Sequence, residues 1–339
     1  MREVPAYSGA MRPLIIGHRG APGYRPEHTE SAYRLAIAQG VDAVEPDIVL
    51  SRDGALVIRH ENEIGSTTDV ADHPEFADRR TTRVVDGVER AGWFTEDFDW
   101  HELATLRCRE RLADLRPDSA EFDGAEAILR LRDVLAIADD ADRPISVVVE
   151  VKHAQYFADR GFAVDELLLA EILRAGWGER CDRVIFECFE LGVLDRLRGF
   201  GAPVVFLTET RGAPADEVAT MGDRARPFSW FRGDAGLEAL AGRVDGISVA
   251  KRDLFVLDSE GVASGTNDLV ARAHARGLVA YAWTLRPENR FLNQRYRSGD
   301  DPAAQGEWAA EFAAILDTGV DGVFVDHPDQ YVGELRDPS

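Results

Sequence analysis

Short apolar runs alternate with helix-like segments along most of the chain, and this alternation limits the possible folds more than any other feature. Most of the runs are near-continuous stretches of apolar residues, which is typical of strands covered on both faces in a parallel sheet. A strand and helix pattern repeated about eight times predicts either a TIM (β/α)8 barrel or a doubly wound sheet. The predicted strands are residues 14–17, 41–50, 55–60, 145–152, 184–189, 203–209, 246–251, 278–284 and 322–326.

The positions of the polar residues favour the barrel. Titratable side chains stand at the C-terminal ends of many different predicted strands, where a barrel assembles its active site, whereas a doubly wound sheet would gather them at one switch point. We therefore predict an α/β fold, a TIM barrel that forms a single domain over residues 1–339. Three predicted helices have a capping residue before them and a glycine beyond them: Thr29 before 30–39, Asp165 before 166–175 and Thr266 before 267–276.

The segment 61–130 interrupts the alternation, because it carries aromatic and acidic residues with little regular pattern. We predict that it is a small subdomain inserted into the barrel between an early strand and the next helix. A lid over the barrel and a stabilising flap are equally compatible with this sequence.

Four of the eight histidines stand at the ends of predicted strands, namely His18, His60, His153 and His327. A single histidine in such a place is more often structural than catalytic. His18 and His60 stand out because both follow short strands early in the chain, and the ends of those strands would face the same mouth of a barrel. Two imidazoles at that mouth could act as acid and base near neutral pH.

Carboxylates form a second candidate group. Glu45 and Asp47 are two residues apart in one predicted strand, so their side chains project from the same face. Such a pair inside a barrel needs a cation or a shared proton, although a role as helix caps or salt-bridge partners is also possible. Glu150 occupies a similar place in another apolar strand. Three hard oxygen ligands suit Mg²⁺ or Ca²⁺ better than zinc, which prefers His and Cys.

Only two of the 39 basic residues are lysines, Lys152 and Lys251, and both end predicted strands. A chain that otherwise uses arginine has lysine where a compact point charge fits a crowded site. We favour a functional role for Lys152. For Lys251, the adjacent Arg252 and Asp253 leave a solvated loop charge open as the alternative.

Composition narrows the class of partner and compartment. The formal net charge of −22 argues against binding to nucleic acid or to an anionic membrane. The three cysteines (Cys108, Cys181 and Cys188) are too few and too unevenly spaced for a disulfide framework, which fits a reducing compartment. No apolar stretch in residues 1–20 is long enough for a signal peptide, and no stretch approaches a membrane span, so we predict a cytoplasmic protein.

Several motifs occur in a fixed order. Residues 15–61 contain HRG after the first strand, PEHT, an ExD pair, and a histidine after a DG turn; VVVEVK, VIFECF, AYAWTL and GVFVDHP follow. This series resembles the glycerophosphodiester phosphodiesterase family over essentially the whole chain. The segment 61–130 and the TLRPEN motif are similar to the larger, bacterial periplasmic-like enzymes of that family, although no leader is recognisable here.

The resemblance implies metal-dependent hydrolysis of a glycerophosphodiester to glycerol 3-phosphate and an alcohol, through a cyclic phosphate. It suggests His18 as the acid and His60 as the base, an order that the sequence alone does not give. The implied roles are an acid–base pair at His18 and His60, a divalent-cation site (Mg²⁺ or Ca²⁺) at Glu45, Asp47 and Glu150, phosphate binding at Arg19 and Lys152, and a glycerol pocket walled by Trp283 and Phe189.

The chain departs from the family pattern at three positions. His28 replaces the usual Asn of the PENT element, Glu61 replaces the Asp that follows the second histidine, and Cys188 replaces a Ser. None of these changes removes an implied catalytic group. His28 and Glu61 leave the substrate preference open.

Two other functions remain as alternatives. The first is a lysophospholipase D-like barrel phosphodiesterase, for which the aromatic residues around Trp93, Phe94 and Trp100 could supply apolar loops at the mouth. The second is a non-catalytic protein that binds glycerophosphodiesters. For the main prediction we expect a small-molecule substrate, no nucleic acid and no stable membrane association, with the oligomeric state left open.

Overall fold

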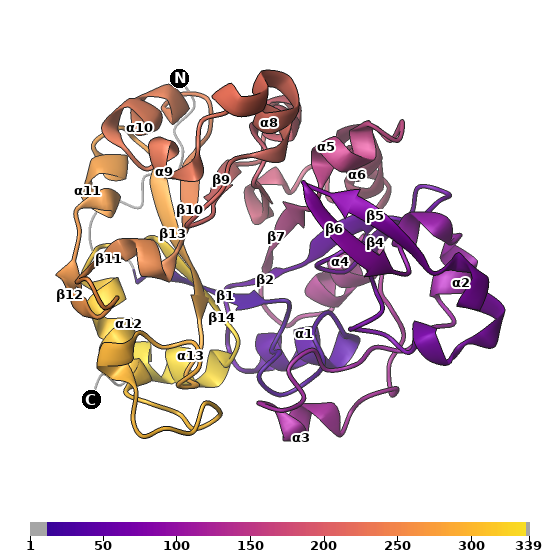
Figure 1. The fold of residues 1–339 in the computed structure, drawn as a ribbon, viewed down its shortest axis with the longest axis horizontal. Helices are drawn as coiled ribbons and strands as arrows, with labels where there is room; N and C mark the ends of the chain where they lie inside the picture. The colour runs from indigo at the N-terminus through magenta and orange to yellow at the C-terminus, as the bar shows by residue number, and fades with distance from the viewer. Residues whose placement is uncertain (1–11, 337–339) are drawn as a thin grey trace.

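Eight parallel strands close into a barrel in the computed structural model, which describes residues 12–336 (Figure 1). The last strand pairs with the first, Gly322 lying opposite Leu14, so the ring is complete and the predicted TIM barrel is confirmed. In order around the barrel the strands are β1 (Leu14–His18), β2 (Ala43–Glu45), β7 (Ser146–Val151), β8 (Val184–Cys188), β9 (Val204–Thr208), β10 (Gly246–Ala250), β13 (Val279–Leu285) and β14 (Gly322–Val325).

The second predicted strand is divided at Pro46. β2 ends at Glu45, and β3 (Asp47–Leu50) continues it, pairing in parallel with β7. The run 55–60, predicted as another strand of the same kind, forms β4 (Leu56–Ile58) and pairs antiparallel to β3 outside the barrel. The link between β3 and β4 is only a few residues long, and a parallel pair requires a crossover of about a dozen residues or more.

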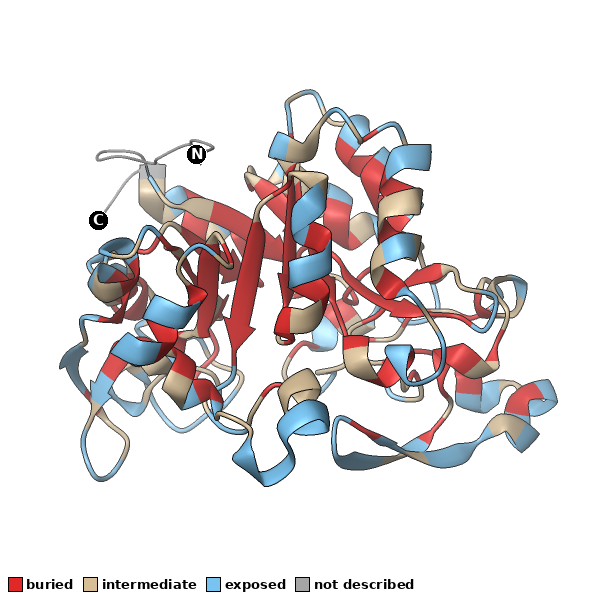
Figure 2. Ribbon diagram, turned by 90° about the horizontal axis from the view of Figure 1, so that it is seen from above, coloured by how far each residue is buried: buried red, intermediate tan, exposed pale blue. Residues whose placement is uncertain are grey.

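Helices surround the barrel, and their exposed faces point outward while the strands at the centre are buried (Figure 2). Thr29 caps the first helix as predicted, because its side chain accepts a hydrogen bond from the backbone N–H of Ala32. Asp165 is not a cap but lies in the first turn of its helix, and Thr266 ends the strand β12 (Ala263–Thr266), which pairs with β11 (Phe255–Leu257). The principal helices are α1 (Glu30–Ala38), α4 (Leu131–Asp139), α6 (Val164–Arg174), α7 (Leu191–Leu197), α10 (Asp234–Leu240), α11 (Leu269–His274), α12 (Trp308–Leu316) and α13 (Pro328–Arg336). The remaining helices outside the segment 61–130 are α5 (Ala154–Ala158), α8 (Ala215–Met221) and α9 (Phe228–Phe231).

The segment 61–130 connects β4 to α4 and holds little regular structure. Its elements are the hairpin β5 (Thr81–Val85) and β6 (Val88–Gly92), the short helices α2 (Trp100–Leu103) and α3 (Pro117–Ala120), and three 3-10 turns. Its buried apolar side chains, among them Phe94 and Phe98, belong to the same cluster as those between the barrel strands and the helices. That the segment is a separate small subdomain within one domain stays a prediction.

A smaller cluster of buried apolar side chains fills the inside of the barrel. It takes one side chain from each of seven strands, while their neighbours in the strands belong to the larger, outer cluster, as the twofold alternation of a strand requires. Side chains two positions further along each strand therefore face the same interior, one layer nearer the C-terminal end. The seven inner residues are Ile16, Ala43, Val148, Ile185, Val205, Tyr281 and Phe324.

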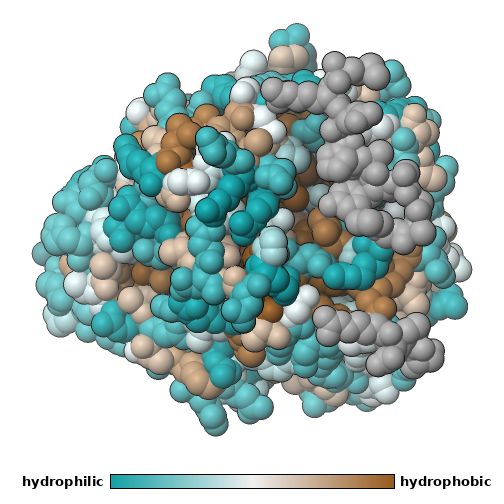
Figure 3. All heavy atoms as spheres, turned by 180° about the vertical axis from the view of Figure 1, so that it is seen from behind, coloured by the Kyte–Doolittle hydropathy of each residue, from teal (hydrophilic) through white to brown (hydrophobic). Residues whose placement is uncertain are grey.

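The described residues contain no helix that is long and apolar enough to cross a membrane. On the face opposite to the view of Figure 1, hydrophilic side chains predominate among the coloured atoms (Figure 3). Residues 1–11, on which part of the signal-peptide prediction rests, lie outside the described range.

Candidate active site

A cavity of about 870 Å³ opens at the C-terminal ends of the barrel strands. Eight of the nine predicted site residues line it, and the ninth, Asp47, is fully buried. Part of the wall is the layer that follows the inner cluster, two positions further along the strands. The residues of this layer that line the cavity are His18, Glu45, Glu150, Glu187, Leu207 and Trp283.

Three buried carboxylates meet at one side of this cavity. One oxygen from each of Glu45, Asp47 and Glu150 lies within 4.8 Å of the other two. Lys152 lies among them, with its Nζ 2.5 Å from Glu150 Oε1 and 3.1 Å from Asp47 Oδ1. Arg19 approaches from β1: its backbone N–H donates to Glu45 Oε2 at 2.8 Å, and its Nε lies 3.3 Å from Asp47 Oδ2.

The charges of this cluster are not balanced within it. Burial, together with the adjacent carboxylates of Asp47 and Glu150, raises the pKa of Glu45 well above its usual range. Burial also raises the pKa of Glu150 to about 8, against the opposing effect of Lys152. A divalent cation would relieve this repulsion, and an all-oxygen set of buried carboxylates fits a hard cation. The donors present therefore suit a divalent metal site.

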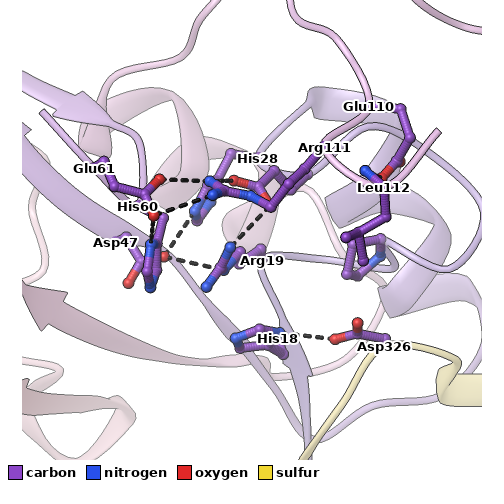
Figure 4. A network of polar contacts seen from close by, with 12 residues as sticks. His18, Arg19, His28, Asp47, His60, Glu61, Glu110, Arg111, Leu112 and Asp326 are labelled. Carbon is purple, nitrogen blue, oxygen red and sulfur yellow. Dashed lines mark hydrogen bonds and ion pairs between the residues drawn. The ribbon is translucent and has the colours of Figure 1, made fainter. Parts of the chain in front are cut away.

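His18 is held by a carboxylate from the last barrel strand. Its Nδ1 lies 2.7 Å from Oδ1 of Asp326, which follows β14 (Figure 4). Burial, and then the positive charge of Arg19, lowers the pKa of His18 to about 4. At neutral pH the imidazole is uncharged, and its Nδ1 contact leaves Nε2 for a ligand in the cavity.

A carboxylate also contacts Nδ1 of His60, and it belongs to the next residue in the sequence. Its Nδ1 lies 2.7 Å from Oε1 of Glu61, and Glu61 is in turn bound by Arg111 (Figure 4). Burial, with the positive charges of Arg19 and Lys152, lowers the pKa of His60 to about 3. The cavity thus contains two neutral imidazoles, each tied by a carboxylate at Nδ1.

His28, one of the departures from the family pattern, lies beneath the carboxylate cluster. Its Nε2 is 2.9 Å from Asp47 Oδ2, and its Nδ1 is 2.7 Å from the hydroxyl of Tyr33. It adopts a left-handed backbone conformation with φ of 62°. This conformation favours Asn over most other residues, so the position tolerates few side chains. In this chain the imidazole orients Asp47.

Aromatic side chains form another part of the wall. The rings of Phe189 and Trp283 meet edge to face, with their centroids 5.9 Å apart, and Lys152 Nζ lies 5.7 Å from the Phe189 ring centroid. An apolar corner beside a cationic group suits a small polyol that carries a phosphate. Phe189 and Trp283 therefore occupy positions compatible with the glycerol-pocket role implied by the resemblance.

The remaining flagged residues have other surroundings. His153 lines the cavity and contacts Asp86 Oδ2, 2.5 Å from its Nδ1, which joins the end of β7 to the β5–β6 hairpin. His327 is outside the cavity lining and packs edge to face against Tyr24. Lys251 is buried in an ion pair with Glu311, so the interpretation as a solvated loop charge is wrong.

The sequence also left important residues without a role. Asp326 and Glu187 received no role, although each lies two positions after an inner barrel residue, as His18 does. Glu187 lines the cavity beside Glu150, its register partner in the sheet, and burial raises its pKa well above the usual range. Arg111 and Arg116 carried no signal, because they lie in the irregular segment 61–130.

An eight-stranded barrel with two imidazoles and a carboxylate cluster at its C-terminal mouth has the groups that a hydrolase needs for acid–base chemistry. The glycerophosphoryl diester phosphodiesterase family model matches residues 18–330, and the chain belongs to this family. It is therefore a phosphoric diester hydrolase, which sets aside the alternative of a non-catalytic binding protein.

Individual relatives extend over most of the chain. A glycerophosphodiester phosphodiesterase of Arabidopsis thaliana is 31% identical over 325 residues, covering 93% of this chain and 84% of that protein. The glycerophosphodiester phosphodiesterase of Treponema pallidum is 25% identical over 350 residues, covering 96% and 92%.

Solved structures share the fold. A putative glycerophosphoryl diester phosphodiesterase from Silicibacter pomeroyi superposes with a TM-score of 0.62 at 20% identity, covering 94% of this chain and 92% of that one. A phosphodiesterase from Oleispira antarctica, solved in complex with the product sn-glycerol-3-phosphate, gives a TM-score of 0.59 at 17% identity, covering 96% and 97%.

Proposed function

We propose that this chain hydrolyses glycerophosphodiesters to glycerol 3-phosphate and an alcohol, with His18 and His60 as the acid–base pair. One observation carries the proposal: two neutral imidazoles line the same cavity as two carboxylates of the buried cluster, Glu45 and Glu150. The family membership and the product found in the Oleispira antarctica structure support the substrate class.

Glu45, Asp47 and Glu150 would hold the divalent cation, Mg²⁺ or Ca²⁺. When bound, such a cation supplies Lewis-acid stabilisation of negative charge on the phosphate and lowers the pKa of a coordinated hydroxyl. Arg19 and Lys152 bind the phosphate beside it. Their surrounding carboxylates raise the pKa of both groups despite burial, which keeps both cationic.

The two histidines move the protons. His60 takes the proton of the glycerol hydroxyl next to the phosphodiester, while the oxygen of that hydroxyl forms a bond to phosphorus. The bond from phosphorus to the leaving oxygen breaks, and His18 donates a proton to that oxygen. Because burial lowers the pKa of His18, this role requires His18 to take up a proton from solvent when the phosphate anion binds beside it. Water then opens the cyclic phosphate with the two roles reversed, which returns both residues to their first state.

The experiment is an assay of glycerol 3-phosphate release from a panel of glycerophosphodiesters, with chelator and with Mg²⁺, Ca²⁺ or Mn²⁺ added back. We expect activity that depends on the cation and is lost in His18→Ala and His60→Ala. Near-wild-type turnover by either folded variant would refute the acid–base assignment. Activity that survives exhaustive chelation would refute the metal role of the three carboxylates.

A lysophospholipid substrate is the second candidate. The residues that could contact its acyl chain differ from those expected from the sequence. Phe94 is fully buried, and Trp93 and Trp100 pack against the core, so the idea that these aromatic residues form exposed loops at the mouth is wrong. Two valines of the β5–β6 hairpin nevertheless line the cavity with exposed side chains. These residues are Val84 and Val88, with exposed fractions of 59% and 53%.

Comparing rates on glycerophosphocholine and lysophosphatidylcholine separates the two candidates. If the acyl chain rests on the hairpin, Val88→Asp lowers only the rate on the lysolipid. Val256→Asp is the matched control, because Val256 is 47% exposed but is not among the cavity-lining residues. Equal effects of the two substitutions would exclude the hairpin as a lipid contact.

A further inference from the structure

Two arginines from the irregular segment 61–130 reach the carboxylates that hold the two histidines. Arg111 binds Glu61 through both terminal nitrogens, with NH1 to Oε1 at 3.0 Å and NH2 to Oε2 at 2.6 Å (Figure 4). Arg116 donates from NH2 to Asp326 Oδ2 at 2.7 Å. The two arginines are five residues apart, yet each serves a different histidine.

The two connections have the same order of groups. In each, an arginine binds a carboxylate, and that carboxylate contacts Nδ1 of a histidine at 2.7 Å. A carboxylate in this place fixes the tautomer and the ring orientation, so that Nε2 faces the substrate. The arginine fixes the carboxylate in turn, because a bidentate or charge-assisted contact restricts its rotation.

The connection to His18 is the more deeply buried one. The side chains of Arg116 and Asp326 are 4% and 1% exposed. Arg116 is further anchored by its Nε, which donates to Glu288 at 2.7 Å, and by its NH1, which donates to the carbonyl oxygen of Pro22 at 3.0 Å. Arg286 also donates to Asp326 Oδ2, at 2.6 Å. In these dry surroundings the ionic contacts are little screened by water.

The connection to His60 has a second branch. Arg111 also binds both oxygens of Glu27, with Nε to Oε2 at 2.9 Å and NH2 to Oε1 at 2.7 Å. Glu27 Oε2 accepts a hydrogen bond from Arg19 NH1 at 2.8 Å. Arg111 therefore connects to a proposed phosphate ligand as well as to a histidine, whereas the contacts of Arg116 lead to His18 alone among the proposed catalytic and phosphate-binding residues.

We propose that the segment 61–130 is a positioning element in which Arg111 and Arg116 orient the two catalytic histidines through Glu61 and Asp326. The proposal rests on the proposed function, since it takes the roles of His18 and His60 from it. At metal sites, loss of the contacts that orient the ligands typically costs ten- to hundredfold in metal affinity or activity. By analogy we expect kcat to fall by about that factor in Arg111→Met and in Arg116→Met.

The two variants differ in KM. Arg116→Met leaves KM for glycerophosphocholine unchanged, because its contacts do not reach Arg19. Arg111→Met raises KM as well, because Glu27 and Arg19 lose their anchor. The matched control is Arg79→Met: Arg79 belongs to the same segment and binds both oxygens of Glu102, but it contacts neither histidine nor its carboxylate. This control lowers the melting temperature and leaves kcat unchanged.

Nitrogen NMR of the histidine rings supplies a readout that global stability does not move. In metal-free protein, ¹⁵N spectra report which ring nitrogen carries the proton; we expect the Nδ1–H form for both residues, and a mixture of tautomers for His18 in Arg116→Met. If that variant does not fold, Asp326→Asn and Arg116→Lys provide the same measurement with smaller changes. Unchanged kcat and unchanged tautomers in folded Arg111 and Arg116 variants would overturn the proposal.

The His18→Ala and His60→Ala variants distinguish this failure from failure of the proposed function. If they lose turnover while the arginine variants match Arg79→Met, only the positioning role is refuted. If the histidine variants themselves keep turnover, the acid–base roles of the proposed function are refuted, and the positioning role is refuted with them.

Discussion

Thermal unfolding with and without a divalent cation tests the carboxylate cluster without measuring activity. A ligand at one hundred times its Kd stabilises the folded state by about 2.7 kcal/mol. Unfolding entropy near the melting temperature is about 2.1 cal/mol/K per residue, which for 339 residues gives about 0.7 kcal/mol per degree. Saturating Mg²⁺ or Ca²⁺ should therefore raise the melting temperature of chelator-stripped protein by about 4 °C.

Glu45→Gln should change the melting temperature in two ways, one without cation and one with it. It raises the melting temperature in chelator, because burial and the adjacent carboxylates disfavour the charge of Glu45. It also abolishes the shift on adding cation. Glu311→Gln is the matched control, since Glu311 is as buried as Glu45, at 2% exposure, and pairs with Lys251 away from the carboxylate cluster. Differential scanning calorimetry showing no shift in the wild type, or an undiminished shift in Glu45→Gln, would refute the metal site.

Three further predictions concern residues around the site. Burial raises the pKa of Glu190 to about 8 from an ordinary value of about 4.3. Between these two values the folded state holds a proton that the unfolded state has lost, so the free energy of unfolding falls as pH rises, by at most about 1.4 kcal/mol per pH unit. Glu190→Gln should therefore match the melting temperature of the wild type near pH 5 and exceed it at pH 8. Trp283→Ala should raise KM for glycerophosphocholine about tenfold with little change in kcat, a loss of about 1.4 kcal/mol of binding, and an equal loss in kcat would contradict a wall role. Lys251→Met leaves the buried Glu311 unpaired and should lower the free energy of unfolding in urea by about 3–5 kcal/mol. The double variant Lys251→Met/Glu311→Gln should recover most of this loss. A Lys251→Met variant as stable as the wild type would refute the pairing.

The barrel and much of its site could be predicted because their information is local. A strand alternates with period two, so the inner residue Ile16 places His18 at the mouth two positions later. The same rule applied to Ile185 and Phe324 would have indicated Glu187 and Asp326, which the motif-based interpretation left without roles. The signal for these two carboxylates was thus present in the strand pattern.

The supporting arginines had no such signal. Arg111 contacts Glu27 across 84 residues of sequence, and Arg116 contacts Asp326 across 210. The segment that contains both arginines lacks periodicity, so neither a face nor a direction could be assigned to their side chains. Only the tertiary arrangement shows that these two of its nine basic residues bind the carboxylates that contact His60 and His18.

Net charge is a second property for which the composition of the sequence does not reveal how the residues are arranged in space. The segment 61–130 carries 18 acidic and 9 basic residues, so its bulk charge should repel a phosphate anion. Surface charges are screened beyond about 8 Å at physiological ionic strength, whereas Arg19 and Lys152 act at contact distance inside the cavity. Their own positive charge depends on the surrounding carboxylates, which raise the pKa of both groups. If Arg19 and Lys152 bind the phosphate as proposed, acidic residues would help this site to bind an anion, because they keep these buried cations charged.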